Sequence, residues 1–159
     1  MSIHPSAIVE TGAELGANVT VGPGAFIEKG AVIGPDCVIG PGAVIYGHSS
    51  LGRGCRVHAH AVIGDWPQDL AFTGQASYVR IGDECVIREG VTIHRGTKEG
   101  TSTVMGHHCF LMANSHLAHN VQMGNHVILA NGVLLAGYAE VGDRVFMGGN
   151  AMVHQFTRI

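Results

Sequence analysis

The sequence is poor in lysine, in charge and in aromatic residues. Lysine occurs only at Lys29 and Lys98, charged residues make up 13% of the 159 residues, and the net charge is −3. Without a basic run, electrostatics give no reason to expect nucleic acid or an anionic membrane as a partner. No apolar run is long enough for membrane insertion, and the first residues lack the pattern of a signal peptide. We therefore expect a single-domain protein of the cytoplasm.

Cysteine is also scarce, and the chain has no CxxC pair. The four cysteines are widely spaced, so they do not suggest a disulfide or zinc framework. Glycine, in contrast, occurs 24 times, and 46% of the residues are apolar. This composition is too apolar for a disordered chain and too rich in glycine for a helix bundle.

A six-residue repeat explains the composition. Every sixth residue from Ile3 to Ile159 is Ile, Leu, Val or Met, except at Asp69, Gln75 and Glu99. A period of six excludes an amphipathic helix, whose period is about 3.6. Short strands with a turn every six residues can instead coil into a prism, in which the bulky residue of each face points inward.

Such coils must stack, because one coil cannot bury its apolar face alone. Stacked strands pair in parallel, roughly 4.8 Å apart. With three faces, one coil takes 18 residues, and the uninterrupted repeats give about eight coils. The hexapeptide pattern resembles the left-handed parallel β-helix, an all-β fold, and the left hand follows from that resemblance. We predict one such domain over residues 1–159.

A second row, two residues before the aliphatic one, is mostly small, with alanine and cysteine frequent, and carries no charge. All four cysteines lie in this row, so we expect them to be buried small hydrophobic residues rather than nucleophiles. They are Cys37, Cys55, Cys85 and Cys109.

Two stretches interrupt the repeat, at about residues 65–80 and 94–104. A solenoid accepts insertions at its corners, and inserted loops often carry function. The first stretch holds the only tryptophan, Trp66, in an apolar and acidic mixture unlike a plain linker. We therefore expect both loops to contribute to a site.

The 11 histidines form the most unusual set of candidate functional residues, since none lies at an inward position of the repeat. The 18-residue period stacks His119, Gly137 and Gln155 along one edge. An exposed imidazole with a glycine amide one coil above it suits acid–base chemistry with an oxyanion donor. Plain surface exposure is the alternative, expected for His4, His48, His58 and His60.

A zinc site is the rival interpretation of the pair His116 and His119. A metal site needs three or four ligands near 2 Å, and two histidines three positions apart are weak evidence. The γ-class carbonic anhydrases, which share the parallel β-helix, use three histidines between subunits. Their paired histidines are five apart, and this sequence offers no matching third ligand.

Five segments resemble the bacterial UDP-N-acetylglucosamine O-acyltransferases, the family that begins lipid A synthesis, and the match covers essentially the whole chain. The resemblance implies a homotrimer, a 3-hydroxyacyl group supplied by acyl carrier protein, the sugar 3-hydroxyl of UDP-N-acetylglucosamine as acceptor, and no metal or dissociable cofactor. The segments are GDWPQDLAFTG (64–74), IREGVTIHRGT (87–97), NSHLAHN (114–120), LANGVLLAGYAEVGD (129–143) and GGNAMVHQF (148–156).

The resemblance also implies roles for single residues. His119 matches the general base, and the amide of Gly137 matches the oxyanion donor. The positions that match substrate-binding or supporting residues, or that line the cleft, are Gln68, Asp69, His94, His116, His154 and Gln155.

Three positions depart from the family pattern. Ala71 stands where lysine is usual, Asn120 where aspartate is common, and Tyr138 where histidine is usual. These departures bear on the acceptor sugar more than on the reaction class. The sequence ends at Ile159, before the C-terminal helical domain of the family, so a truncated, non-catalytic trimeric scaffold is the alternative expectation.

Overall fold

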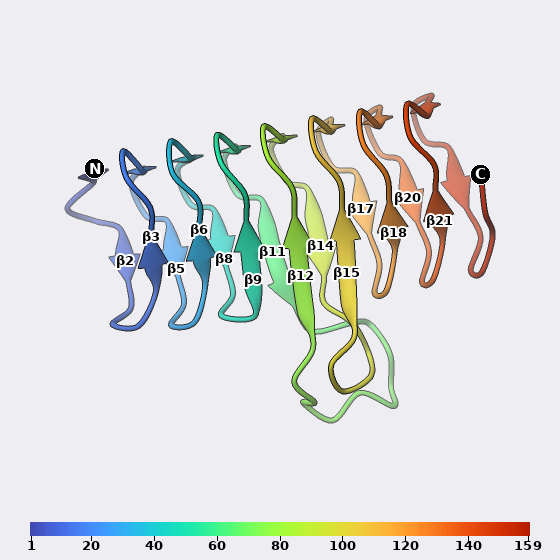
Figure 1. Ribbon diagram of the computed structural model, residues 1–159, viewed down its shortest axis with the longest axis horizontal. Helices are drawn as coiled ribbons and strands as arrows, with labels where there is room; N and C mark the ends of the chain where they lie inside the picture. Colours follow the sequence, from blue (N-terminus) through green and yellow to red (C-terminus); the bar gives the residue numbers. More distant parts are fainter.

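The computed structural model describes residues 1–159 as a left-handed parallel β-helix, the predicted fold (Figure 1). Coils follow one another along the long axis, with the two chain ends at opposite ends of the stack. Three parallel sheets of eight, eight and seven strands form the faces of the prism. The chain contains no helix long and apolar enough to cross a membrane.

Each coil contributes one strand to each sheet in turn. Sheet 1 contains β1 (Ser2–Ile3), β4 (Thr20–Val21), β7 (Val38–Ile39), β10 (Arg56–Val57), β13 (Val86–Ile87), β16 (Phe110–Leu111), β19 (Ile128–Leu129) and β22 (Phe146–Met147). Sheet 2 contains β2 (Ile8–Val9), β5 (Phe26–Ile27), β8 (Val44–Ile45), β11 (Val62–Asp65), β14 (Thr92–His94), β17 (His116–Leu117), β20 (Leu134–Leu135) and β23 (Met152–Val153). Sheet 3 contains β3 (Glu14–Leu15), β6 (Val32–Ile33), β9 (Ser49–Leu51), β12 (Tyr78–Ile81), β15 (Ser102–Met105), β18 (Gln122–Met123) and β21 (Glu140–Val141).

The strand register shows why the repeat survives both interruptions. Regular coils pair residues 18 apart, as Ile8 pairs with Phe26. Across the first interruption Val62 pairs with Thr92, 30 residues on, and across the second Thr92 pairs with His116, 24 residues on. Both insertions therefore add a multiple of six residues, and the six-residue aliphatic row keeps its inward phase after them.

The core is the continuous column of inward residues that the repeat predicts. The largest fully buried side chains are isoleucine, leucine and methionine of the six-residue row. All four cysteines are free and at most 1% exposed, as predicted. Each thiol also donates to a glycine carbonyl oxygen, for example Cys55 Sγ to Gly82 O at 3.1 Å, so the buried thiol row is hydrogen-bonded.

The two inserted loops leave the prism at the corner where sheet 2 turns into sheet 3, and project from the middle of the stack (Figure 1). The first loop takes residues 66–77 and the second takes residues 95–101. They pair with each other, since Gly100 N donates to Ala76 O at 2.7 Å. Arg95 lies beneath the first loop, with its guanidinium 5.3 Å from the centre of the Phe72 ring.

Candidate functional site

His94, His116 and His119 lie at or next to the corner that carries the loops. His119 follows β17 and Gly137 follows β20 at the equivalent corner of the next coil. Tyr138 N donates to His119 O at 3.1 Å, and Phe156 N donates to Gly137 O at 3.3 Å. These bonds stack successive corners, so His119, Gly137 and Gln155 form one column, as their spacing predicts.

His119 packs directly against the backbone of Gly137. A Cβ atom added to Gly137 would lie 2.6 Å from His119 Nε2, so only glycine leaves room for the imidazole. The expectation of an exposed imidazole was wrong, because His119 is only 9% exposed. Tyr138 stands edge-on to the ring, with 5.4 Å between ring centres, and contributes to this cover.

Two further imidazoles lie beside His119. His94 and His116 meet edge to face, with ring centres 4.7 Å apart, and His116 Nδ1 lies 2.7 Å from Thr92 Oγ1. Burial lowers the pKa of His116 to about 4, and the neighbouring His94 and His119 add to the effect. Burial also lowers the pKa of His94, which the Asp65 carboxylate partly opposes. Both imidazoles are therefore neutral near pH 7.

The Gly137 N–H makes no hydrogen bond within the chain. Equivalent corners of other coils show that the side chain one coil below decides whether such an N–H is paired. Gly47 N is capped by Glu28 Oε2 at 2.6 Å, and Lys29 N is capped in the same way by Glu10. Ala118 occupies the equivalent position below Gly137 and has no acceptor. An unpaired N–H beside an imidazole is a ready donor for a developing oxyanion.

Three side chains behind His119 form a hydrogen-bonded group that the candidate list did not include. Asn120 Oδ1 lies 3.2 Å from His119 Nδ1 and 3.0 Å from Thr97 Oγ1. Thr97 Oγ1 in turn lies 3.1 Å from the Tyr138 hydroxyl. In the sequence, Asn120 and Tyr138 stand out only as departures from the family pattern. Their places directly after His119 and Gly137 are the one sequence feature that points to a role in the site.

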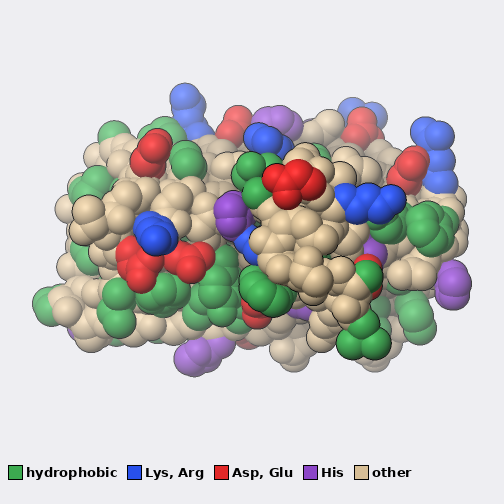
Figure 2. Space-filling model, turned by 90° about the horizontal axis from the view of Figure 1, so that it is seen from below, with side chains coloured by type: hydrophobic (Ala, Val, Ile, Leu, Met, Phe, Trp, Pro, Cys, Tyr) green, Lys and Arg blue, Asp and Glu red, His purple; other side chains and the backbone are tan.

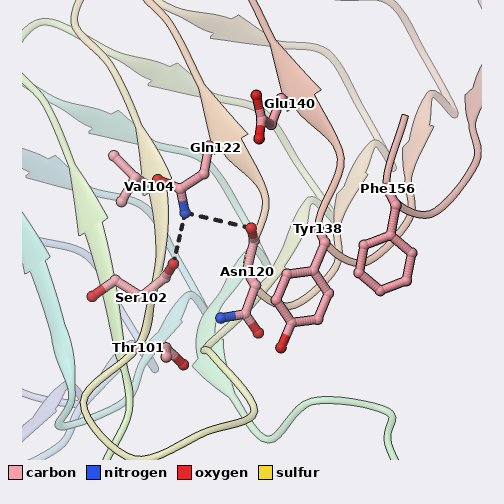
Figure 3. A pocket seen from close by; sticks show the side chains of 8 residues that line it. All are labelled: Thr101, Ser102, Val104, Asn120, Gln122, Tyr138, Glu140 and Phe156. Carbon is pink, nitrogen blue, oxygen red and sulfur yellow. Dashed lines mark hydrogen bonds between the residues drawn. The ribbon is translucent and has the colours of Figure 1, made fainter. Parts of the chain in front are cut away.

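Two cavities flank this group. One of about 470 Å³ is drawn in Figure 3, where Tyr138 and Phe156 lie face to face and the Gln122 amide bonds the backbone oxygens of Ser102 and Asn120. The other, of about 440 Å³, lies against both loops and includes Asp69. Tyr138 and Phe156 line both, with ring centres 5.0 Å apart.

The candidate residues separate into two sets. The structure brings His94, His116, His119 and Gly137 together, and Asp69 shares a cavity with Thr97 and Tyr138. Gln68, His154 and Gln155 are instead exposed. Figure 2 views the side of the molecule from which the loops project, with histidine side chains beside their bulge.

The rival metal hypothesis finds no support within one chain. No group of three His, Cys, Asp or Glu side chains is placed to hold a metal ion. His94, His116 and His119 lie near one another, but their ring nitrogens are not placed to share one metal ion.

Comparisons with known proteins agree with the fold. The model of the bacterial transferase hexapeptide family (six repeats) matches residues 30–65 and 102–137. Curated acyl-[acyl-carrier-protein]–UDP-N-acetylglucosamine O-acyltransferases from Alkalilimnicola ehrlichii and Agrobacterium fabrum are 55% and 42% identical over 99% of this chain. The chain spans 61% and 58% of the length of these two relatives.

Solved structures give the same result. The UDP-N-acetylglucosamine O-acyltransferase of Moraxella catarrhalis superposes with a TM-score of 0.95 at 40% identity, over 100% of this chain and 62% of that one. The Campylobacter jejuni enzyme gives a TM-score of 0.93 at 42% identity, over 99% of this chain and 62% of that one.

The buried neutral imidazole of His116 predicts a loss of stability in acid. Its pKa is about 4 in the folded protein, below the ordinary value of 6.5, so the unfolded chain binds more protons between these two pH values. The free energy of unfolding should therefore fall as pH drops from 6.5 to 4, by at most about 1.4 kcal/mol per pH unit for this group. Thermal unfolding followed by circular dichroism across this range should show a shallower fall for His116→Gln. Identical slopes for both proteins would contradict the assignment.

Proposed function

Since the chain belongs to the UDP-N-acetylglucosamine O-acyltransferase family over the part of its relatives' length that it spans, we propose that it transfers a 3-hydroxyacyl group from acyl carrier protein to the 3-hydroxyl of UDP-N-acetylglucosamine. The observation that carries the proposal is the His119 imidazole packed against the open amide of Gly137. We place the reaction in the cytoplasm, as the first step of lipid A synthesis.

His119 serves as the general base. Its Nε2 takes the proton of the sugar 3-hydroxyl while that oxygen attacks the thioester carbonyl carbon. The carbonyl oxygen becomes an oxyanion, and the Gly137 N–H donates to it. When the intermediate collapses, the carbon–sulfur bond breaks and the leaving thiolate takes the proton from the imidazolium. The ester product and the free thiol balance the step, and no cofactor enters it.

The surrounding residues bind and orient the substrates. We assign sugar contacts to Gln68 and Asp69 of the first loop, and supporting contacts to His154 and Gln155. His94 and His116 are neutral next to His119, so they accept or donate single hydrogen bonds without adding charge. Such groups suit recognition of sugar hydroxyls rather than of phosphates.

A homotrimer is the second part of the proposal. The outward face of sheet 2 is largely apolar, with Ile8, Phe26, Val44, Val62 and Leu134 aligned from coil to coil. Ile8 and Leu134 are 59% and 42% exposed. Exposed contiguous apolar surface marks an interaction site. Because this face also carries Thr92 and His116, a second copy packed on it would close over the histidines.

Loss of the His119 imidazole should abolish turnover. We expect acylated nucleotide sugar from the parent chain, by mass spectrometry, with UDP-N-acetylglucosamine and a panel of 3-hydroxyacyl carrier proteins. His119→Ala should lower the rate at least about 100-fold, while His60→Ala, a matched change at an exposed histidine, should keep it. Equal product from parent and His119→Ala would remove His119 as the base. Stoichiometric zinc in chelator-free protein would favour the metal hypothesis instead.

The open amide is tested at Ala118. A glutamine there can cap Gly137 N as Glu28 caps Gly47 N, whereas a leucine of similar size has no acceptor. Ala118→Gln should therefore lower kcat about 100-fold more than Ala118→Leu, the usual cost of one lost oxyanion donor. Equal kcat values for the two variants would show that the Gly137 amide does not act on the oxyanion.

The trimer face is tested by a charge placed on each of two sheets. Leu134 in sheet 2 and Val32 in sheet 3 are 42% and 40% exposed, so they form a matched pair. Leu134→Glu should convert the trimer to monomer in light scattering, because a buried unpaired carboxylate opposes assembly. Val32→Glu should leave the trimer intact. A trimeric Leu134→Glu protein would place the interface elsewhere.

A further inference from the structure

The hydrogen-bonded group behind His119 contains no charged side chain. Asn120 and Thr97 are 6% and 8% exposed. Asn120 Oδ1 lies 3.0 Å from Thr97 N as well as 3.0 Å from Thr97 Oγ1. Because a backbone N–H can only donate, the amide oxygen, and not the amide nitrogen, must face Thr97. The orientation of the Asn120 amide is therefore determined by the second loop.

This orientation determines which nitrogen of His119 carries the proton. His119 Nδ1 lies 3.2 Å from the same Asn120 Oδ1 atom. An amide oxygen only accepts, so the neutral imidazole must place its hydrogen on Nδ1. The lone pair then lies on Nε2, the atom packed against Gly137. A general base needs this tautomer, since Nε2 must be free to take the substrate proton.

The same donor and acceptor assignment extends to the Tyr138 hydroxyl. The Thr97 hydroxyl hydrogen points to Asn120 Oδ1, so its oxygen is free to accept from the Tyr138 hydroxyl at 3.1 Å. Tyr138 makes this contact from the left-handed backbone region, at φ 58°, which a bulky residue rarely adopts. Stacking on Phe156, at an interplanar angle of 13°, helps to hold the ring there.

We propose that Thr97 and Tyr138 are positioning residues, which act through the Asn120 amide to hold His119 in the Nδ1–H tautomer. The inference rests on the proposed function for its catalytic meaning, but the tautomer itself is a property of the folded chain. Three neutral groups do the orienting, so the position of the second loop and the state of the base are linked through Thr97.

The tautomer is measured directly by nitrogen NMR on protein labelled with ¹⁵N-histidine, at a pH where the imidazole is neutral. The His119 signals are assigned by their loss in His119→Gln. We expect a protonated Nδ1 and an unprotonated Nε2 in the parent. Thr97→Val removes the hydroxyl donor to Asn120 Oδ1 but keeps the backbone N–H donor, so it should shift the ratio part of the way toward the Nε2–H form. Thr97→Ser, which keeps the hydroxyl, should restore the parent ratio.

Tyr138→Phe is a second variant that removes only the hydroxyl and keeps the stacked ring. It should shift the tautomer ratio in the same direction as Thr97→Val, by a smaller amount. A parent protein with the proton on Nε2 would overturn the proposal. So would variants that fold like the parent, by circular dichroism, and keep the parent ratio.

Kinetics separate this inference from the proposed function. In acyl transfer, Thr97→Val should lower kcat roughly 10- to 100-fold, the usual cost of losing a partner that orients a histidine, with KM little changed. A tautomer shift without detectable acyl transfer in any variant would support the positioning role and count against the proposed reaction. An unchanged tautomer ratio would refute the positioning role, whatever the activity.

Discussion

In-register stacking of parallel coils is the constraint on which the rest of the molecule depends. Away from the two ends of the stack, each inward aliphatic side chain is covered by the equivalent residue of the coils above and below, as Ile27 is by Val9 and Ile45. A shift by one residue would turn these side chains to solvent, so the register tolerates only insertions that return the chain to the same phase. The two loops meet this condition, because they lengthen their coils by multiples of six residues.

Stacking also gives each corner the same backbone geometry as the corner below. The candidate site arises from differences between the side chains at equivalent corners. The corner N–H at Gly47 is capped by a glutamate, whereas the corner N–H at Gly137 is open above Ala118. Asn120, Tyr138 and Phe156 succeed one another with a left-handed backbone, at φ 60°, 58° and 57°. The same geometry that ends a strand elsewhere therefore presents an amide and two stacked rings here.

The electrostatics of the site follow from its neutrality. Burial disfavours charge on His94 and His116, and Asn120 places an amide, rather than a carboxylate, next to His119. In the proposed reaction the imidazoles therefore act through hydrogen bonds and through the tautomer of His119, with little help from a fixed charge. In the proposed reaction a neutral acceptor hydroxyl and a neutral thioester enter such a site, and charge develops only on the oxyanion and on His119.

The repeat in the sequence by itself determined the prism, the buried cysteines and the column of His119, Gly137 and Gln155. All of these follow from the six-residue period, which can be counted directly in the sequence. The functions assigned to the residues of this column remain predictions. The tertiary structure alone decided that His119 is buried, that Gly137 N is unpaired and that Thr97 bonds Asn120. Thr97 belongs to an inserted loop, whose path no repeat fixes. Burial and hydrogen bonding there depend on contacts between segments with no periodic relation, so they appear only when the chain is folded.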